Sequence, residues 1–342
     1  MYERWLRPLL FRLSADQAHA LARFALGLPV IWQLLGAAAR QSSADQRLAT
    51  SLAGLCLANP VGLAPGFDKS GDLLPALSRL GFGYLVVGSI TREPRWGNPF
   101  PRLVRYPERQ AIANSMGLPN RGLAAAVDRL RRAPTAGCPV IASVAGFSAD
   151  ELLQSVREIE PHVAAVEIGL VCPNTTETER LEEQRIFSTL VDGLRGARKP
   201  VFVKLPPHHS LADRDHVLAL LDECLAVGLA GVSVSGTRQI VEPRLGSGRG
   251  SLAGREVFPD TLRVVSDVAE RSAGRLAIKA SGGVFNGEDA LRLLEAGATT
   301  VELYSAFIYH GWEVAGRINR ELLRHLGQRR VPELRASQPA RV

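Results

Sequence analysis

The chain has 342 residues, of which 46% are hydrophobic and 22% are charged, so it contains enough apolar material for a sizeable buried core. Its formal net charge of +7 suits nucleic acid, an anionic membrane surface or an acidic ligand. Because the basic residues are scattered and do not interleave with aromatic residues, we expect no nucleic-acid partner.

The cysteines indicate a reducing compartment. Cys56, Cys138, Cys172 and Cys224 form no C-x-x-C pair and have no histidine at zinc-binding spacing, so we predict no metal site. So few cysteines in so long a chain argue against a disulfide framework. The sequence has no apolar run long enough to span a bilayer and no signal-peptide pattern, so we expect neither a spanning helix nor secretion.

Residues 1–42 differ from the rest and are predicted to form a helical extension. Residues 1–13 have the pattern of a short helix with an apolar side, and Ser14 and Gln17 form a capping box that starts a second helix. Apolar sides combined with exposed arginines are typical of helices that lie in a membrane interface. A helical hairpin packed on the main domain fits the same pattern, and the pattern alone does not choose between them.

Residues 43–342 are predicted to form one barrel domain. Eight short apolar runs alternate with helical stretches: 61–64, 84–88, 139–144, 164–168, 200–204, 230–234, 276–280 and 300–304. Helical patterns fall between them at 71–80, 148–159, 186–197, 214–228, 259–272 and 287–297. Strands rich in Val and Ile without alternation are buried on both faces, as in a parallel sheet. This order predicts an α/β fold, a (β/α)8 TIM barrel, with a doubly wound open sheet as the alternative.

Two segments interrupt the alternation of strands and helices. Residues 102–117 have the pattern of a hairpin, and residues 236–255 form a long Gly-rich loop after the sixth strand. Barrel enzymes carry their chemistry on loops at the carboxyl ends of the strands. We therefore expect both segments to border a functional site.

The ends of the seventh and eighth strands indicate a phosphate site. Gly282 and Gly283 follow the seventh strand, and Tyr304 and Ser305 end the eighth. Barrels commonly bind phosphate on the loops after these two strands, where backbone N–H groups reach its oxygens. The Gly-Gly pair alone would equally serve a tight turn.

Two lysines and a cysteine stand at strand ends. Lys204 ends the fifth strand and Lys69 follows the first; each requires an anionic or electron-rich partner unless it lies at the solvated rim. Cys172 lies just past the fourth strand, where a thiol can act as a base, although most lone cysteines are small buried apolar residues. Asn114 and Asn174 fall in loops and offer amide groups suited to amide or imide edges.

Several motifs, in order along the chain, resemble the dihydroorotate dehydrogenase family. They are NPVGLAPGFDKSG, GSITREPRWGNPFPRLVR, IANSMGLPNRG, CPNT, VFVKLPP, GSLAGR, ASGGV and ELYSAFIYHG. The resemblance covers about residues 2–325, and the opening MYERWLRPLLFRLSADQAHALA is similar to the N-terminal helices of the membrane-associated, quinone-using branch.

The resemblance implies an FMN enzyme that oxidises dihydroorotate to orotate and passes electrons to a quinone, associated peripherally with the cytoplasmic face of the membrane. It places the catalytic base at Cys172. Implied substrate-binding residues are Lys69, Asn114, Asn174 and Thr237. Implied cofactor-binding residues are Ala64, Gly66, Ser89, Ser143, Lys204, Ser235, Gly254, Gly282, Gly283, Tyr304 and Ser305.

The sequence also departs from the family pattern. The quinone-using branch usually has Ser as base and Asn in place of Ser143, so Cys172 and SVAG (143–146) resemble the soluble branches. Two further asparagines that grip the pyrimidine correspond to Gly169 and Gly236, which removes hydrogen bonds and opens volume. A divergent dihydroorotate dehydrogenase and a paralogue with a bulkier carbonyl or carboxylate substrate therefore both remain open. A flavin-binding membrane scaffold without activity is disfavoured by Lys69, Cys172 and Lys204.

Overall fold

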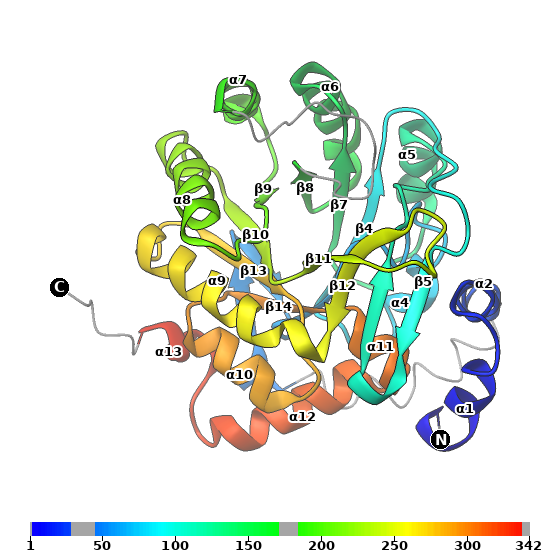
Figure 1. Cartoon of the computed structure of the whole chain (residues 1–342). Coiled ribbons are helices and arrows are strands. Elements are labelled where there is room, and N and C mark those ends of the chain that lie inside the picture. Colours follow the sequence, from blue (N-terminus) through cyan, green and yellow to red (C-terminus); the bar gives the residue numbers. More distant parts are fainter. Residues whose placement is uncertain (1, 29–44, 171–183, 337–342) are drawn as a thin grey trace.

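Eight parallel strands close into a barrel in the computed structural model, which describes residues 2–28, 45–170 and 184–336 (Figure 1). In chain order the strands are β3 (Val61–Leu63), β4 (Tyr84–Ile90), β7 (Val140–Ala145), β8 (Ala165–Gly169), β9 (Val201–Lys204), β10 (Gly231–Ser235), β13 (Ala277–Ser281) and β14 (Thr300–Leu303). The last strand pairs with the first, Val301 opposite Val61, which closes the ring. The predicted TIM barrel is confirmed, and each strand lies within two residues of its predicted bounds.

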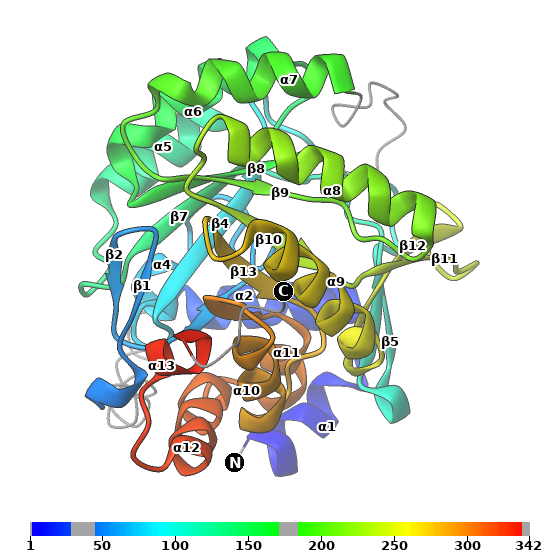
Figure 2. The same cartoon turned by 90° about the vertical axis from the view of Figure 1, so that its left-hand side faces the viewer.

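Helices surround the barrel on the outside (Figures 1 and 2). They are α4 (Leu74–Leu77), α5 (Leu123–Arg132), α6 (Ala149–Ile159), α7 (Gln184–Gly193), α8 (Leu211–Ala226), α9 (Phe258–Ser272), α10 (Gly287–Glu295), α11 (Ser305–His310), α12 (Val314–Leu326) and α13 (Val331–Ala336). The helix predicted over 71–80 is only the single turn α4. The carboxylate of Asp68 accepts hydrogen bonds from the backbone N–H groups of Gly71, Asp72 and Leu73, which holds this segment in a turn instead.

The two insertions pair with each other in a second sheet. The predicted hairpin forms β5 (Leu103–Tyr106) and β6 (Ala111–Asn114), and the Gly-rich loop forms β11 (Arg238–Val241) and β12 (Arg249–Gly254). Their order is β11-β12-β6-β5, with Ser251 opposite Asn114. Figure 2 shows this sheet at one end of the barrel and the hairpin of β1 (Thr50–Leu52) and β2 (Leu55–Leu57) at the opposite end.

The described part of the N-terminal segment, residues 2–28, is mostly helical, as expected, and the rest of the predicted extension lies outside the described residues. A π-helical turn (Tyr2–Leu6) leads into α1 (Arg7–Leu10), and α2 (Ala15–Leu26) begins at the predicted capping box. Arg23 ties α2 to the barrel by donating to the backbone oxygen of Phe67 at 3.0 Å. None of the described helices is long and apolar enough to cross a membrane.

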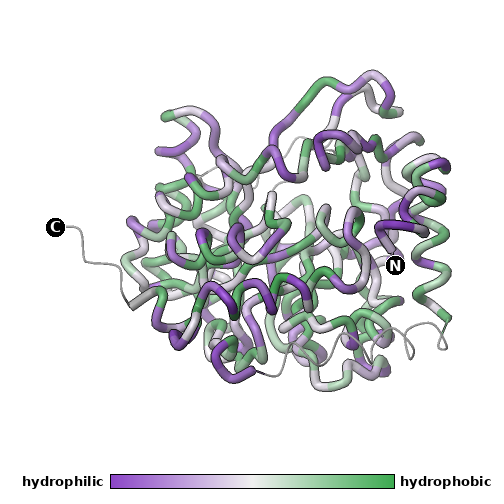
Figure 3. The backbone as a smooth tube through the Cα atoms, turned by 90° about the horizontal axis from the view of Figure 1, so that it is seen from below, coloured by the Kyte–Doolittle hydropathy of each residue, from purple (hydrophilic) through white to green (hydrophobic). Residues whose placement is uncertain are grey.

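Large apolar side chains on these N-terminal helices face solvent. The side chains of Trp5, Leu9 and Phe24 are 62%, 59% and 67% exposed. Figure 3, in which the N-terminus is marked, shows apolar stretches at the outer edge of the molecule near that end. The surfaces of most soluble proteins lack such clusters of exposed apolar side chains. A cluster of this kind is typical of a site that contacts a partner or a lipid surface.

Candidate active site

A cavity of about 910 Å³ opens at the carboxyl ends of the barrel strands. Thirteen sequence-predicted site residues line it: Ala64, Gly66, Lys69, Ser89, Asn114, Lys204, Ser235, Thr237, Gly254, Gly282, Gly283, Tyr304 and Ser305. Ser143 is buried in β7, with its hydroxyl 3.2 Å from that of Ser89. Cys172 and Asn174 lie outside the described residues.

The seventh and eighth strands end in a backbone-lined corner of the cavity. Gly283 has a φ of +79°, and a Cβ built there would lie 2.5 Å from the Cβ of Phe258 at the start of α9. Only glycine therefore lets this turn pack against α9, which brings its backbone to the cavity wall beside Ser305. Such a corner, with little side-chain bulk, is suited to a phosphate group.

Lys69 brings its amine to the cavity after β3. Its Nζ donates to the backbone oxygen of Gly66 at 2.7 Å. Burial and the neighbouring charge of Arg23 together lower the pKa of Lys69 to about 7, with Asp68 acting in the opposite direction. An arriving carboxylate would supply the negative charge that this amine needs to stay protonated.

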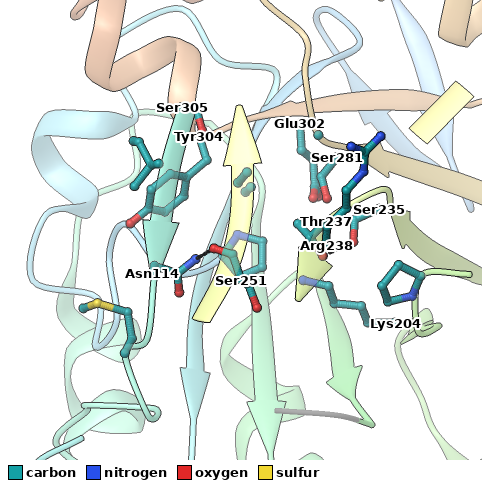
Figure 4. Close-up of a pocket in the computed structure, with 18 of the residues that line it drawn as sticks. Asn114, Lys204, Ser235, Thr237, Arg238, Ser251, Ser281, Glu302, Tyr304 and Ser305 are labelled. Carbon is teal, nitrogen blue, oxygen red and sulfur yellow. Dashed lines mark hydrogen bonds between the residues drawn. The ribbon is translucent and has the colours of Figure 1, made fainter. Parts of the chain in front are cut away.

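A second lysine and several polar groups occupy other walls (Figure 4). Lys204 projects from the end of β9 on the same side as Ser235 and Thr237. On the other side, Asn114 donates to the backbone oxygen of Ser251 at 3.2 Å, an interaction between the two inserted hairpins. The inserted sheet therefore forms part of the site and does more than cover it.

The two glycines that depart from the family pattern sit in different surroundings. Gly169 ends β8 and lines the cavity, where, among the described residues, an added Cβ would meet the backbone oxygen of Val144 alone, at 3.7 Å. An added Cβ on Gly236 would lie 2.4 Å from the backbone nitrogen of Thr261, whose hydroxyl also accepts from the Gly236 N–H at 3.1 Å. The described residues thus leave room for a side chain at position 169 and none at position 236.

Sequence reasoning missed a charged cluster inside the barrel. Lys279 lies 2.6 Å from Glu167 and 3.0 Å from Glu302, and Glu302 also lines the cavity. The signal was present, because each residue interrupts a strand expected to be buried on both faces.

This closed parallel barrel, with two lysines and a glycine-lined corner at one mouth, defines a barrel enzyme whose ligand lies at the carboxyl ends of the strands. The sequence model of the family described as dihydroorotate dehydrogenase matches residues 47–326. The chain belongs to the dihydroorotate dehydrogenase family.

Relatives and solved structures of similar length support the assignment to this family. The chain is 35% identical to a dihydroorotate dehydrogenase (quinone) of Chloroflexus aurantiacus, covering 95% of this chain and 96% of that one. It is also 35% identical to the enzyme of the same name from Methylococcus capsulatus, covering 94% and 98%. The structure of the Eimeria tenella enzyme in complex with ferulenol has a TM-score of 0.82 at 26% identity, covering 95% and 96%. The ligand-free form from that organism has a TM-score of 0.79 at 27% identity, covering 91% and 98%.

Proposed function

We propose that this protein is an FMN-dependent dehydrogenase that oxidises dihydroorotate to orotate and passes the electrons to a quinone. The observation that carries the proposal is that one cavity brings together Lys69, Asn114 and Lys204 with the glycine-lined corner at Gly282 and Gly283. These groups come from strands and loops far apart in the sequence. Their chemistry suits an anionic substrate, an electron-rich ring and a phosphate.

The lining residues fit FMN. The phosphate would rest on Gly254, Gly282, Gly283, Tyr304 and Ser305, all of which line the cavity. The ring would lie near Ala64, Gly66, Ser89, Lys204 and Ser235, with Ser143 supporting Ser89 from behind. When bound, the flavin supplies the acceptor for the hydride.

The substrate would be held and deprotonated by this chain's own side chains. Lys69 would pair with the substrate carboxylate, and Asn114, Asn174 and Thr237 would hydrogen-bond its ring. Cys172 would remove a proton from the carbon next to a carbonyl. The roles of Cys172 and Asn174 are proposed from the sequence, in which both follow Gly169 within five residues.

The N-terminal helices would bind the quinone and rest on the membrane surface. Trp5, Leu9 and Phe24 expose apolar area, and Arg4 and Arg12 supply positive charge for anionic headgroups. This arrangement supports peripheral association with a membrane surface, and we propose that the surface is the cytoplasmic face.

A second candidate substrate is favoured by Gly169 and Gly236. Neither glycine can offer the amide that the family pattern has at that position. The open space at Gly169 suits a carboxylate-bearing substrate that is bulkier than dihydroorotate on that side. The flavin chemistry and the role of Lys69 would be the same.

Release of the cofactor tests the proposal. Purified protein should be yellow, and denaturation should release one flavin per chain with the mass and chromatographic behaviour of FMN. A colourless protein that takes up no added FMN would exclude both candidate substrates as proposed.

A further inference from the structure

A charged layer fills the barrel directly beneath the cavity. Lys279 on β13 is fully buried, with Nζ 2.6 Å from Glu167 Oε2 on β8 and 3.0 Å from Glu302 Oε1 on β14. Ser233 donates to Glu167 at 2.6 Å, and the hydroxyl of Tyr84 donates to Glu302 at 3.1 Å. The three charged side chains therefore form one hydrogen-bonded unit.

Stability alone does not account for this layer. Barrel interiors are usually filled by bulky branched residues. Replacing a buried ion network by packed hydrophobic residues is often neutral or stabilising, because the charges must give up their hydration. Strongly perturbed buried groups next to a cavity are candidates for a functional role.

Glu302 connects the layer to the cavity. Its carboxyl group lines the cavity wall, and in Figure 4 it lies on the same side as Lys204. Among the described residues, the charged and titratable groups that act on Glu302 include Lys279 from β13, Glu167 from β8, Lys204 from β9 and Tyr84 from β4.

The two carboxyl groups differ in how firmly they hold a proton. Burial raises the pKa of Glu302, and the negative charge of Glu167 adds to this, while Lys279 and Lys204 oppose it. Burial also raises the pKa of Glu167, but Lys279 and Lys204 outweigh it and hold that pKa below its ordinary value. Glu167 is therefore the permanent partner of Lys279, and Glu302 is the member able to exchange its proton.

We propose that Glu302 is a positioning residue that controls how strongly Lys204 acts on the ligand, by holding or releasing a proton at the wall of the cavity that both residues line. With the proton in place, the charge of Lys204 is available to negative charge on a ligand ring. Once Glu302 is ionised, its charge offsets that of Lys204 and the same ligand charge is stabilised less. The inference rests on the proposed flavin site.

Sulfite binding to the flavin measures this effect without turnover. Sulfite adds to an oxidised flavin and leaves negative charge on the ring, so its dissociation constant reports the positive charge beside the ring. Glu302→Gln keeps the shape of the side chain and removes its ionisation. At each pH, the dissociation constant of the variant is divided by that of the unchanged protein. The ionisation of sulfite affects both constants equally and cancels in this ratio.

At acidic pH, Glu302→Gln and the unchanged protein should bind sulfite equally tightly. At a pH above the pKa of Glu302, the variant should bind sulfite about tenfold more tightly than the unchanged protein does. Glu160→Gln is the matched control, because Glu160 is also buried but bonds to the backbone N–H of Lys199 instead. Its ratio should stay near one at every pH. A Glu302→Gln ratio that does not change with pH would overturn the inference.

Glu167→Gln decides the question if Glu302→Gln fails to fold. Without Glu167, Lys279 is left with Glu302 as its carboxylate partner, and Glu302 should lose its proton at a lower pH. The pH at which sulfite binding weakens should therefore move down. A midpoint that stays in place or moves up contradicts the inference. If the unsubstituted protein were colourless and took up no FMN, the proposed function itself would be contradicted. Failure of the inference and failure of the proposed function are therefore distinguishable.

Discussion

Lys69 is the residue whose charge state depends most directly on the substrate. Its amine contacts a backbone oxygen, that of Gly66, and burial lowers its pKa to about 7. The charged form binds a carboxylate, so affinity is fully present below that pKa and is lost above it. We expect the Kd for orotate to rise by about tenfold per pH unit above about pH 7.

Equilibrium titration of orotate against the flavin spectrum across pH measures this dependence. Lys69→Met should bind orotate weakly at all pH values, with a flat profile. A profile equally steep in that variant would place the titrating group elsewhere.

Cys172 is proposed as the base on the strength of its sequence position. Cys172→Ser keeps a proton acceptor of similar size and should retain part of the activity. Cys172→Ala should lose about 10²-fold or more in the rate of flavin reduction by substrate. Rapid mixing under anaerobic conditions measures that rate, and an unchanged rate in the Ala variant would exclude Cys172 as the base.

Gly236 and Gly169 should respond differently to the same substitution. Gly236→Asn must displace Thr261 at the start of α9, which should cost about 1–3 kcal/mol of unfolding free energy. Gly169→Asn enters open space and should leave stability nearly unchanged. Urea unfolding of both variants measures the difference in unfolding free energy. Equal losses of unfolding free energy would show that the two positions have equal room for a side chain.

At the scale of elements, the barrel strands could be predicted from sequence because their Val- and Ile-rich runs carry the signal locally. The pairing of β6 with β12 could not, because it joins Asn114 to Ser251 across 137 residues and antiparallel partners that far apart have no shared local pattern. Residues that line the cavity could be predicted from the sequence where they lie at the end of a predicted strand. The Lys279 layer was missed, although each of its charged residues interrupts an apolar strand, because nothing in the local pattern shows that these side chains meet or that one of them borders the cavity.

Substrate oxidation should not require the N-terminal helices. Contacts such as Arg23 to the backbone oxygen of Phe67 and Tyr2 to that of Ile308 tie them to the barrel, but their exposed apolar residues lie outside the cavity lining. Deleting residues 1–40 should abolish quinone reduction while flavin reduction by substrate survives. Measuring the two half-reactions separately tests this, and survival of both would place the quinone elsewhere.

At the scale of the whole molecule, the two ends of the barrel have different tasks. The hairpin β1–β2 packs over an apolar cluster that includes Leu52, Tyr84 and Phe202 and closes one end. The inserted sheet and the N-terminal helices lie toward the cavity, so substrate chemistry, proposed quinone access and membrane contact share one side of the molecule (Figures 1 and 2).

Anaerobic mixing of the purified flavoprotein with dihydroorotate tests the central claim most directly. The account predicts rapid loss of the absorbance of the oxidised flavin, followed by its return when a quinone is added. A flavin that stays oxidised in the presence of saturating dihydroorotate would contradict dihydroorotate oxidation and favour the bulkier carboxylate substrate.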